Sequence, residues 1–154
     1  MLGTNTDTVL FTTADYVITG EAEEALADLI SQIAAGTRPE KKHILATPPP
    51  LDRLPSPYNL YTDEDIRNRI VYVESSRGCP YRCAFCLSSR DKTIRYVPLP
   101  QFFADMEMLL GKGVRLFKFT DRTFNLDDAR VVEILNFFSD RIADTLQLHF
   151  EIMP

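Results

Sequence analysis

The three cysteines of this 154-residue chain lie within one short segment, SSRGCPYRCAFC, at residues 75–86. Cys79, Cys83 and Cys86 follow the spacing C-x3-C-x2-C. An odd number of cysteines suits a metal site better than a disulfide framework. Four cysteines usually hold a four-iron cluster that passes electrons, whereas three would leave one iron open to a substrate or cofactor. The spacing therefore predicts a 4Fe-4S cluster with these three thiolates as its ligands.

Two other chemistries fit the same cysteines. A zinc ion could be bound by the three thiolates and completed by His43 or His149, although zinc sites usually draw on two separated ligand pairs. Cys83 and Cys86 could also form a redox-active C-x-x-C pair. Both alternatives stay open from the sequence alone.

Composition limits the setting in which this chemistry would occur. The net charge of −5 argues against a general nucleic-acid-binding surface, and 45% hydrophobic residues suffice for an ordinary globular core. A run of about 18 apolar residues is absent from the sequence, as is a basic leader followed by an apolar stretch. We therefore expect a cytoplasmic protein with reduced cysteines and no membrane partner.

The second half of the chain alternates between strand and helix patterns. Ile70–Val73, VRLFKF and LQLHFEI read as strands, and the segments between them place apolar residues at helical spacing. This order predicts an α/β fold with a parallel sheet, whose ligands bind at the carboxyl ends of the strands. The cysteine segment follows the first of these strands.

The first half has a different organisation. DYVITG reads as a strand, and a helix is expected from about 21 to 35, where acidic residues occupy the first turn. Five prolines between residues 47 and 58 forbid regular structure there. The predicted divisions are residues 1–46, a proline-rich linker at 47–69, and a core at 70–154.

The segment CPYRCAFC directly after a strand resembles the signature of the radical S-adenosylmethionine (radical SAM) enzymes. Together with DYVITGEAEEAL and LPSPY, it resembles the subgroup that carries a cobalamin-binding domain ahead of the radical barrel. The resemblance implies the N-terminal half of a (β/α)6-type partial barrel, preceded by the remnant of a Rossmann-like cobalamin-binding domain. Because only three strands fit after residue 70, it also implies a fragment, with cobalamin bound only by a longer parent protein.

The resemblance further implies a reaction. The cluster on Cys79, Cys83 and Cys86 would reductively cleave S-adenosylmethionine to a 5′-deoxyadenosyl radical, which takes hydrogen from an unknown small-molecule or peptide substrate. Flavodoxin or ferredoxin would supply the electron. Phe85 would lie against the adenine, and Asp121 would approach the cofactor from the end of the second strand.

Glu151 is the third candidate for cofactor binding. It belongs to a polar row with Gln147 and His149 that faces either a barrel lumen or solvent. The family often has a Gly-Gly-Glu segment where this chain has Thr120, Asp121 and Arg122, so the contact to the methionine amino group is unassigned, and the sequence identifies no catalytic residue. Two further hypotheses are a non-catalytic iron-sulfur or zinc module and an inactive truncated product.

Overall fold

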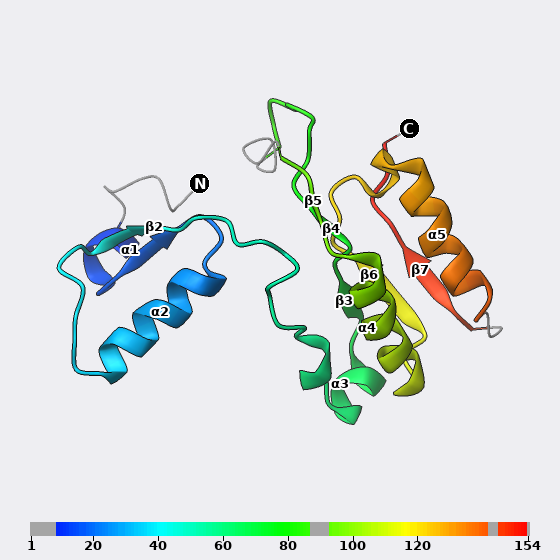
Figure 1. Ribbon diagram of the computed structural model, residues 1–154, viewed down its shortest axis with the longest axis horizontal. Helices are drawn as coiled ribbons and strands as arrows, with labels where there is room; N and C mark the ends of the chain where they lie inside the picture. The colour runs from blue at the N-terminus through cyan, green and yellow to red at the C-terminus, as the bar shows by residue number, and fades with distance from the viewer. Residues whose placement is uncertain (1–8, 87–92, 142–144, 154) are drawn as a thin grey trace. The chain divides into compact units, whose positions relative to one another are not determined.

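The structure is a computed structural model that describes residues 9–86, 93–141 and 145–153. The chain divides into two compact units, Met1–Leu54 and Pro55–Pro154 (Figure 1). Each unit has its own parallel sheet. The domain limits expected from the sequence, at residues 46 and 69, stay predictions.

The first unit is built around one strand-helix-strand crossover. β1 (Val17–Thr19) and β2 (His43–Leu45) pair in parallel, and α2 (Glu23–Ala34) connects them. A short helix, α1 (Val9–Thr13), precedes β1. The expected strand and helix are confirmed, whereas β2 was not predicted because three residues are too few to show a strand pattern in the sequence.

The second unit contains a three-stranded parallel sheet in the order β3-β6-β7. Its strands are β3 (Val71–Val73), β6 (Leu116–Phe119) and β7 (Gln147–His149), and the crossover helices are α4 (Leu99–Gly111) and α5 (Asp128–Ser139). The α/β class and the parallel pairing are confirmed. The described strands form two parallel sheets and one antiparallel pair, and none of these sheets closes into a barrel.

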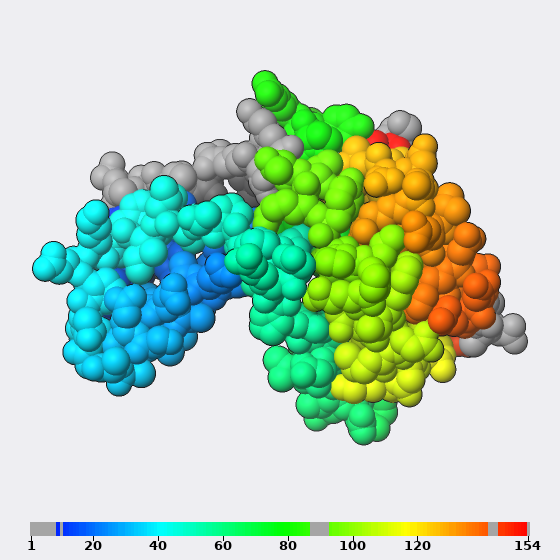
Figure 2. Space-filling model, viewed as in Figure 1, coloured from blue at the N-terminus to red at the C-terminus, as the bar shows by residue number. Residues whose placement is uncertain are grey.

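The core of the second unit lies on one face of this sheet. Both crossover helices contribute fully buried residues to it, and Figure 2 shows α4 and α5 next to each other on the surface. Phe103 of α4 and Phe137 of α5 stack with ring centroids 4.6 Å apart. The core cluster includes Val71, Val73, Phe102, Met106, Leu109, Phe117, Phe119, Ile134 and Phe138.

The opposite face of the sheet carries polar and exposed side chains. Strand register places Tyr72 beside Lys118, and Lys118 beside His149. Tyr72 and His149 are exposed, and Lys118 is half-buried. The polar row expected in LQLHFEI, with Gln147 and His149, therefore lies on the exposed face of β7.

Local signals explain where the helices begin and end. α4 has proline in its first turn and is followed by Gly113 at a φ of +94°, a backbone conformation that favours glycine. α5 begins after Asp127, whose side chain accepts a hydrogen bond from the backbone N–H of Arg130. Asn125 lies in a 3₁₀ turn before α5 and exchanges two hydrogen bonds with the backbone of Met153.

The predicted linker contains more regular structure than its prolines suggested. A 3₁₀ turn at Tyr58–Leu60 is followed by α3 (Asp63–Asn68). Thr62 and Asp65 form a reciprocal capping box at the start of α3, in which each side chain accepts a hydrogen bond from the other residue's backbone N–H.

A two-stranded antiparallel ribbon, β4 (Ser76–Arg77) with β5 (Arg95–Tyr96), flanks the cysteine segment.

Candidate functional site at the carboxyl end of the sheet

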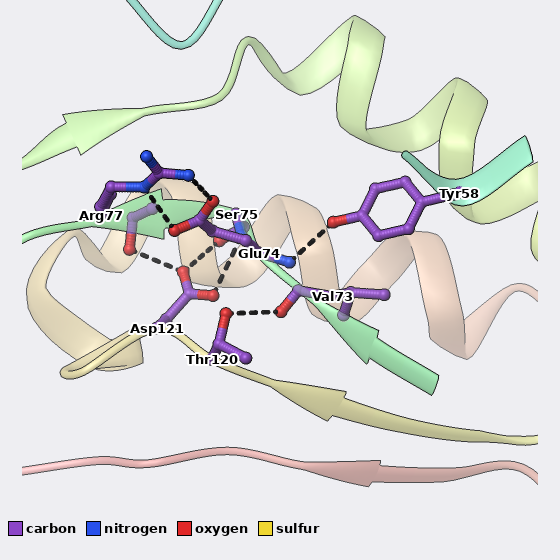
Figure 3. A network of polar contacts seen from close by, with 8 residues as sticks. Tyr58, Val73, Glu74, Ser75, Arg77, Thr120 and Asp121 are labelled. Atoms are coloured by element: carbon purple, nitrogen blue, oxygen red, sulfur yellow. Dashed lines mark hydrogen bonds and ion pairs between the residues drawn. The ribbon is translucent and has the colours of Figure 1, made fainter. Parts of the chain in front are cut away.

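A fully buried carboxylate lies at the carboxyl end of β6. Asp121 accepts hydrogen bonds from the Ser75 backbone N–H at 3.0 Å, the Ser75 hydroxyl at 2.6 Å and the Ser76 hydroxyl at 2.6 Å (Figure 3). Burial raises the pKa of Asp121 above its ordinary value, and the hydrogen bonds from Ser75 and Ser76 oppose that shift. The carboxylate thus joins the segment that leaves β3 to the segment that leaves β6.

Arg130 of α5 reinforces this junction from the helix side. Its Nη2 donates to the backbone oxygens of Ser75 at 3.0 Å and Val97 at 2.7 Å, and its guanidinium lies 5.0 Å from the ring centroid of Tyr96. Burial lowers the pKa of Arg130, and the nearby Asp121 acts against that shift. The Nε of Arg130 is buried without a hydrogen-bond partner among the described residues.

The cysteine segment leaves this junction with its thiols in three different environments. Cys79 is buried, with Sγ 3.4 Å from the Thr123 hydroxyl, whereas Cys83 is half-buried and Cys86 is exposed. The backbone N–H of Cys86 donates to the Cys83 carbonyl at 3.1 Å. Among the described residues, no group of three or more His, Cys, Asp or Glu side chains is arranged to hold a metal ion.

The histidines considered as a fourth zinc ligand have other surroundings. His43 lies in the first unit, where its Nε2 is 2.6 Å from the Thr19 hydroxyl and its ring packs edge-on against Phe11. His149 lies on the exposed face of β7. Neither histidine belongs to a ligand group within the part of the chain that the structure describes.

The remaining predicted site residues lie near the same end of the sheet or in the cysteine segment. The Glu151 carboxylate is 3.8 Å from the guanidinium of Arg122, and the Glu151 carbonyl accepts a hydrogen bond from Phe124. Phe85 is 94% exposed. The structure thus brings Arg122 and Glu151 together, while the cofactor contacts expected of Phe85, Asp121 and Glu151 stay predictions, as does metal ligation by the cysteines.

Sequence reasoning missed the residues that fix this end of the sheet. Ser75, Ser76 and Arg130 are separated from their partners by 33 to 55 positions along the chain, so no local spacing could reveal them. The only available signal was the run of small polar residues between a buried strand and the cysteines. Small polar residues are common in loops, and they do not indicate which distant residue is the hydrogen-bond partner.

Comparison with known proteins gives limited but specific information. No protein-family model matches the chain. A protein of Pyrococcus horikoshii, named an uncharacterized methyltransferase, is 29% identical over 143 residues. The match covers 78% of this chain and 31% of the relative, so the chain spans about a third of the length of that protein.

These findings contradict the radical SAM assignment. The relative bears the name of a methyltransferase, no radical SAM family model matches, and the described cysteines are not gathered with other ligands into a metal site. The predicted 4Fe-4S cluster, the radical reaction and the cobalamin-related origin of the first unit therefore have no support. The alternative of a non-catalytic iron-sulfur or zinc module is contradicted in the same way. The cysteine spacing misled because it fixes separation along the chain, not the direction of each thiol.

Two expectations about the surroundings of the protein have different outcomes. No helix among the described residues is long and apolar enough to cross a membrane. The expected partners, a small-molecule or peptide substrate and a flavodoxin- or ferredoxin-type electron donor, stay predictions.

Proposed function

We propose that this chain forms part of an enzyme that transfers a methyl group from S-adenosylmethionine. The support is its similarity to the Pyrococcus horikoshii methyltransferase along 78% of its length. The α/β architecture agrees with a Rossmann-like methyltransferase fold, in which parallel strands alternate with helices. The match covers 31% of that relative, so the proposal concerns binding of the methyl donor and leaves the acceptor open.

One structural observation indicates where the methyl donor would bind. Asp121 fixes the segments that follow β3 and β6, which are neighbouring strands, at the carboxyl end of the sheet. Open α/β sheets bind ligands in this position, and a binding site requires loops that are held before the ligand arrives. Asp121 would act as a positioning residue, because both of its carboxylate oxygens already accept hydrogen bonds.

Three exposed side chains suit the parts of S-adenosylmethionine: Arg122 and Glu151, which follow β6 and β7, and Phe85 of the cysteine segment. The Arg122 guanidinium, which is 57% exposed, would bind the methionine carboxylate. The Glu151 carboxylate would accept hydrogen bonds from the ribose hydroxyls or the amino group. The ring of Phe85 would stack on the adenine, since both of these flat groups lose apolar surface to water by doing so.

When bound, S-adenosylmethionine supplies an electrophilic methyl carbon on a sulfonium. A nucleophile of the acceptor forms a bond to that carbon as the carbon–sulfur bond breaks, which leaves S-adenosylhomocysteine. The acceptor proton passes to a base or to water. The residues proposed here bind and orient the donor, and the acceptor site is not assigned to them.

The test is calorimetric titration of the chain with S-adenosylmethionine and S-adenosylhomocysteine. Saturable binding is expected, with about tenfold weaker affinity in Arg122→Gln and Phe85→Leu. Arg53→Gln and Tyr81→Leu are matched controls, because both residues are exposed and neither is part of the proposed site. If neither compound binds, or if the controls lose as much affinity as the site variants, the proposed donor site is wrong.

A further inference from the structure

The Pro55–Pro154 unit contains a hollow whose lining residues are not used by the proposed methyl-donor site. It encloses about 420 Å³ between β3 and the segment that contains the 3₁₀ turn and α3. This volume falls in the range of about 300–1,000 Å³ that is typical of small-molecule sites. Its lining includes three aromatic and three charged residues, Tyr58, Tyr61, Tyr72, Asp65, Arg69 and Glu74.

The three tyrosines differ in how firmly they are held. Tyr58 is buried, and its hydroxyl oxygen accepts a hydrogen bond from the Glu74 backbone N–H at 2.9 Å (Figure 3). Burial raises the pKa of Tyr58 well above its ordinary value, so the phenol stays neutral. Tyr61 is half-buried, and Tyr72 is 47% exposed. The hollow therefore combines one fixed ring with two accessible rings, which suits a planar ligand that stacks or packs edge-on.

The carboxylates of the hollow already have cationic partners. Asp65 lies 3.3 Å from Arg69, and hydrogen bonds from Thr62 lower the pKa of Asp65. Glu74 accepts two hydrogen bonds from the Arg77 guanidinium, at 2.8 Å and 2.7 Å. These pairs leave little net negative charge at the lining.

Two lysines that do not line the hollow lie next to its tyrosines and add positive charge there. Lys118 Nζ lies 5.6 Å from the ring centroid of Tyr72, and it has no carboxylate partner among the described residues. Among the described residues, the hydrogen-bond partners of Lys112 Nζ are two backbone oxygens, those of Asn59 at 3.3 Å and Tyr61 at 3.1 Å. An ammonium group that has no carboxylate nearby can form a charge-assisted hydrogen bond with an incoming anion.

We propose that this hollow binds a planar aromatic molecule that carries an anionic group. The ring packs on Tyr72 and Tyr61, and the carboxylate or phosphate of the ligand pairs with Lys118. An aromatic carboxylate and a nucleoside monophosphate share this chemistry. The proposal does not depend on methyl transfer, because it rests on the rings and charges that line the hollow.

The test is titration of the full chain with four probes, followed by calorimetry or by NMR shifts. The probes are adenosine monophosphate, 4-hydroxybenzoate, adenosine and ribose 5-phosphate. At least one of the first two should bind saturably, because each combines a ring with an anion, and it should bind about tenfold more tightly than adenosine or ribose 5-phosphate. The probe that binds more tightly shows whether the hollow prefers the phosphate of a nucleotide or the carboxylate of an aromatic acid.

Variants connect that binding to the hollow. Tyr72→Leu and Lys118→Gln should each weaken the favoured probe about tenfold, since each removes one of the two recognised features. Tyr81→Leu and Lys41→Gln are matched controls that should bind normally, because neither residue lines the hollow. Circular dichroism of each variant verifies that it is folded. The proposal is overturned if no ring-bearing anion binds, if adenosine or ribose 5-phosphate binds as tightly as the favoured probe, or if either folded variant, Tyr72→Leu or Lys118→Gln, keeps normal affinity.

Discussion

Ser75 donates to both carboxylate oxygens of Asp121, its backbone N–H to one and its hydroxyl to the other. Both residues are buried, and they follow neighbouring parallel strands. A buried carboxylate is tolerated only when hydrogen bonds replace its lost hydration, so the contact is specific as well as stabilising.

The Asp121→Asn substitution should lower the free energy of unfolding by about 1–3 kcal/mol. The amide keeps one acceptor oxygen but turns an NH2 group toward serine groups that are already donating. Urea denaturation measures the change. Asp140→Asn, on an exposed residue, should alter the same quantity by less than about 0.5 kcal/mol. Equal stability of Asp121→Asn and the wild type would show that the second acceptor oxygen of Asp121 is not needed.

The stability contributed at Asp121 should depend on pH in a defined direction. Its folded pKa is raised above the ordinary value of 3.8, so the folded state holds the proton more tightly than the unfolded state. Stability from this group is then fully present below about pH 3.8 and is lost as the pH rises through the folded pKa. The stability difference between wild type and Asp121→Asn should shrink between acid and neutral pH. A difference that grows with pH would mean that the hydrogen bonds outweigh burial.

Arg130→Met should destabilise the second unit by about 1–3 kcal/mol, because it removes hydrogen bonds to Ser75 and Val97. Arg130→Lys should restore only part of this loss, since an ammonium can donate to these two oxygens but lacks the planar guanidinium that lies over the Tyr96 ring. Thermal unfolding of both variants tests the expectation. Arg122→Met is the control and should change the unfolding temperature little, because that side chain is 57% exposed and its ion pair is 3.8 Å long.

The three thiols should react at different rates with iodoacetamide. Cys86 is exposed and should be alkylated first, and buried Cys79 last, at least about tenfold more slowly because it requires local opening. Mass spectrometry of peptides after timed quenching gives the three rates. In urea the rates should converge. Equal rates in the native protein would place Cys79 outside the core.

Phe119→Ala should cost about 3–5 kcal/mol of stability, the usual range for removing a buried aromatic ring. Phe119 is completely buried and lies within 5.9 Å of the Phe102 ring centroid and 4.6 Å of that of Phe150. Phe85→Ala is a matched control, since that ring is 94% exposed and should change stability little. Denaturant unfolding separates the two outcomes.

Local patterns were sufficient to predict most elements of this fold. The strands expected at Ile70–Val73, VRLFKF and LQLHFEI, with helical spacing between them, correctly indicated the order β3, α4, β6, α5 and β7. The β4–β5 ribbon was missed because each strand has only two residues, and its partners are far apart in sequence. Strand pairing of this kind has no local signature.

The candidate site was less predictable than the fold. Asp121 was singled out from its place after a strand, but its role as the acceptor for Ser75 and Ser76 depends on contacts across 45 and 46 positions. The cysteine spacing suggested that the three thiolates bind one metal cluster, whereas the structure buries Cys79 in the core and leaves Cys86 at the surface. Burial of each thiol depends on tertiary packing, which spacing does not encode.

The junction at Asp121 also bears on the order of folding. Ser75 lies 46 positions before its carboxylate partner, so we expect the contact to form together with or after the pairing of β3 and β6. Contacts between distant residues form late, because closing a long loop costs entropy before any interaction repays it. During refolding, we therefore expect the cysteine segment to gain a fixed starting point only once the sheet exists, and the Cys79 thiol, which the fold buries, to stay accessible to oxidants until then.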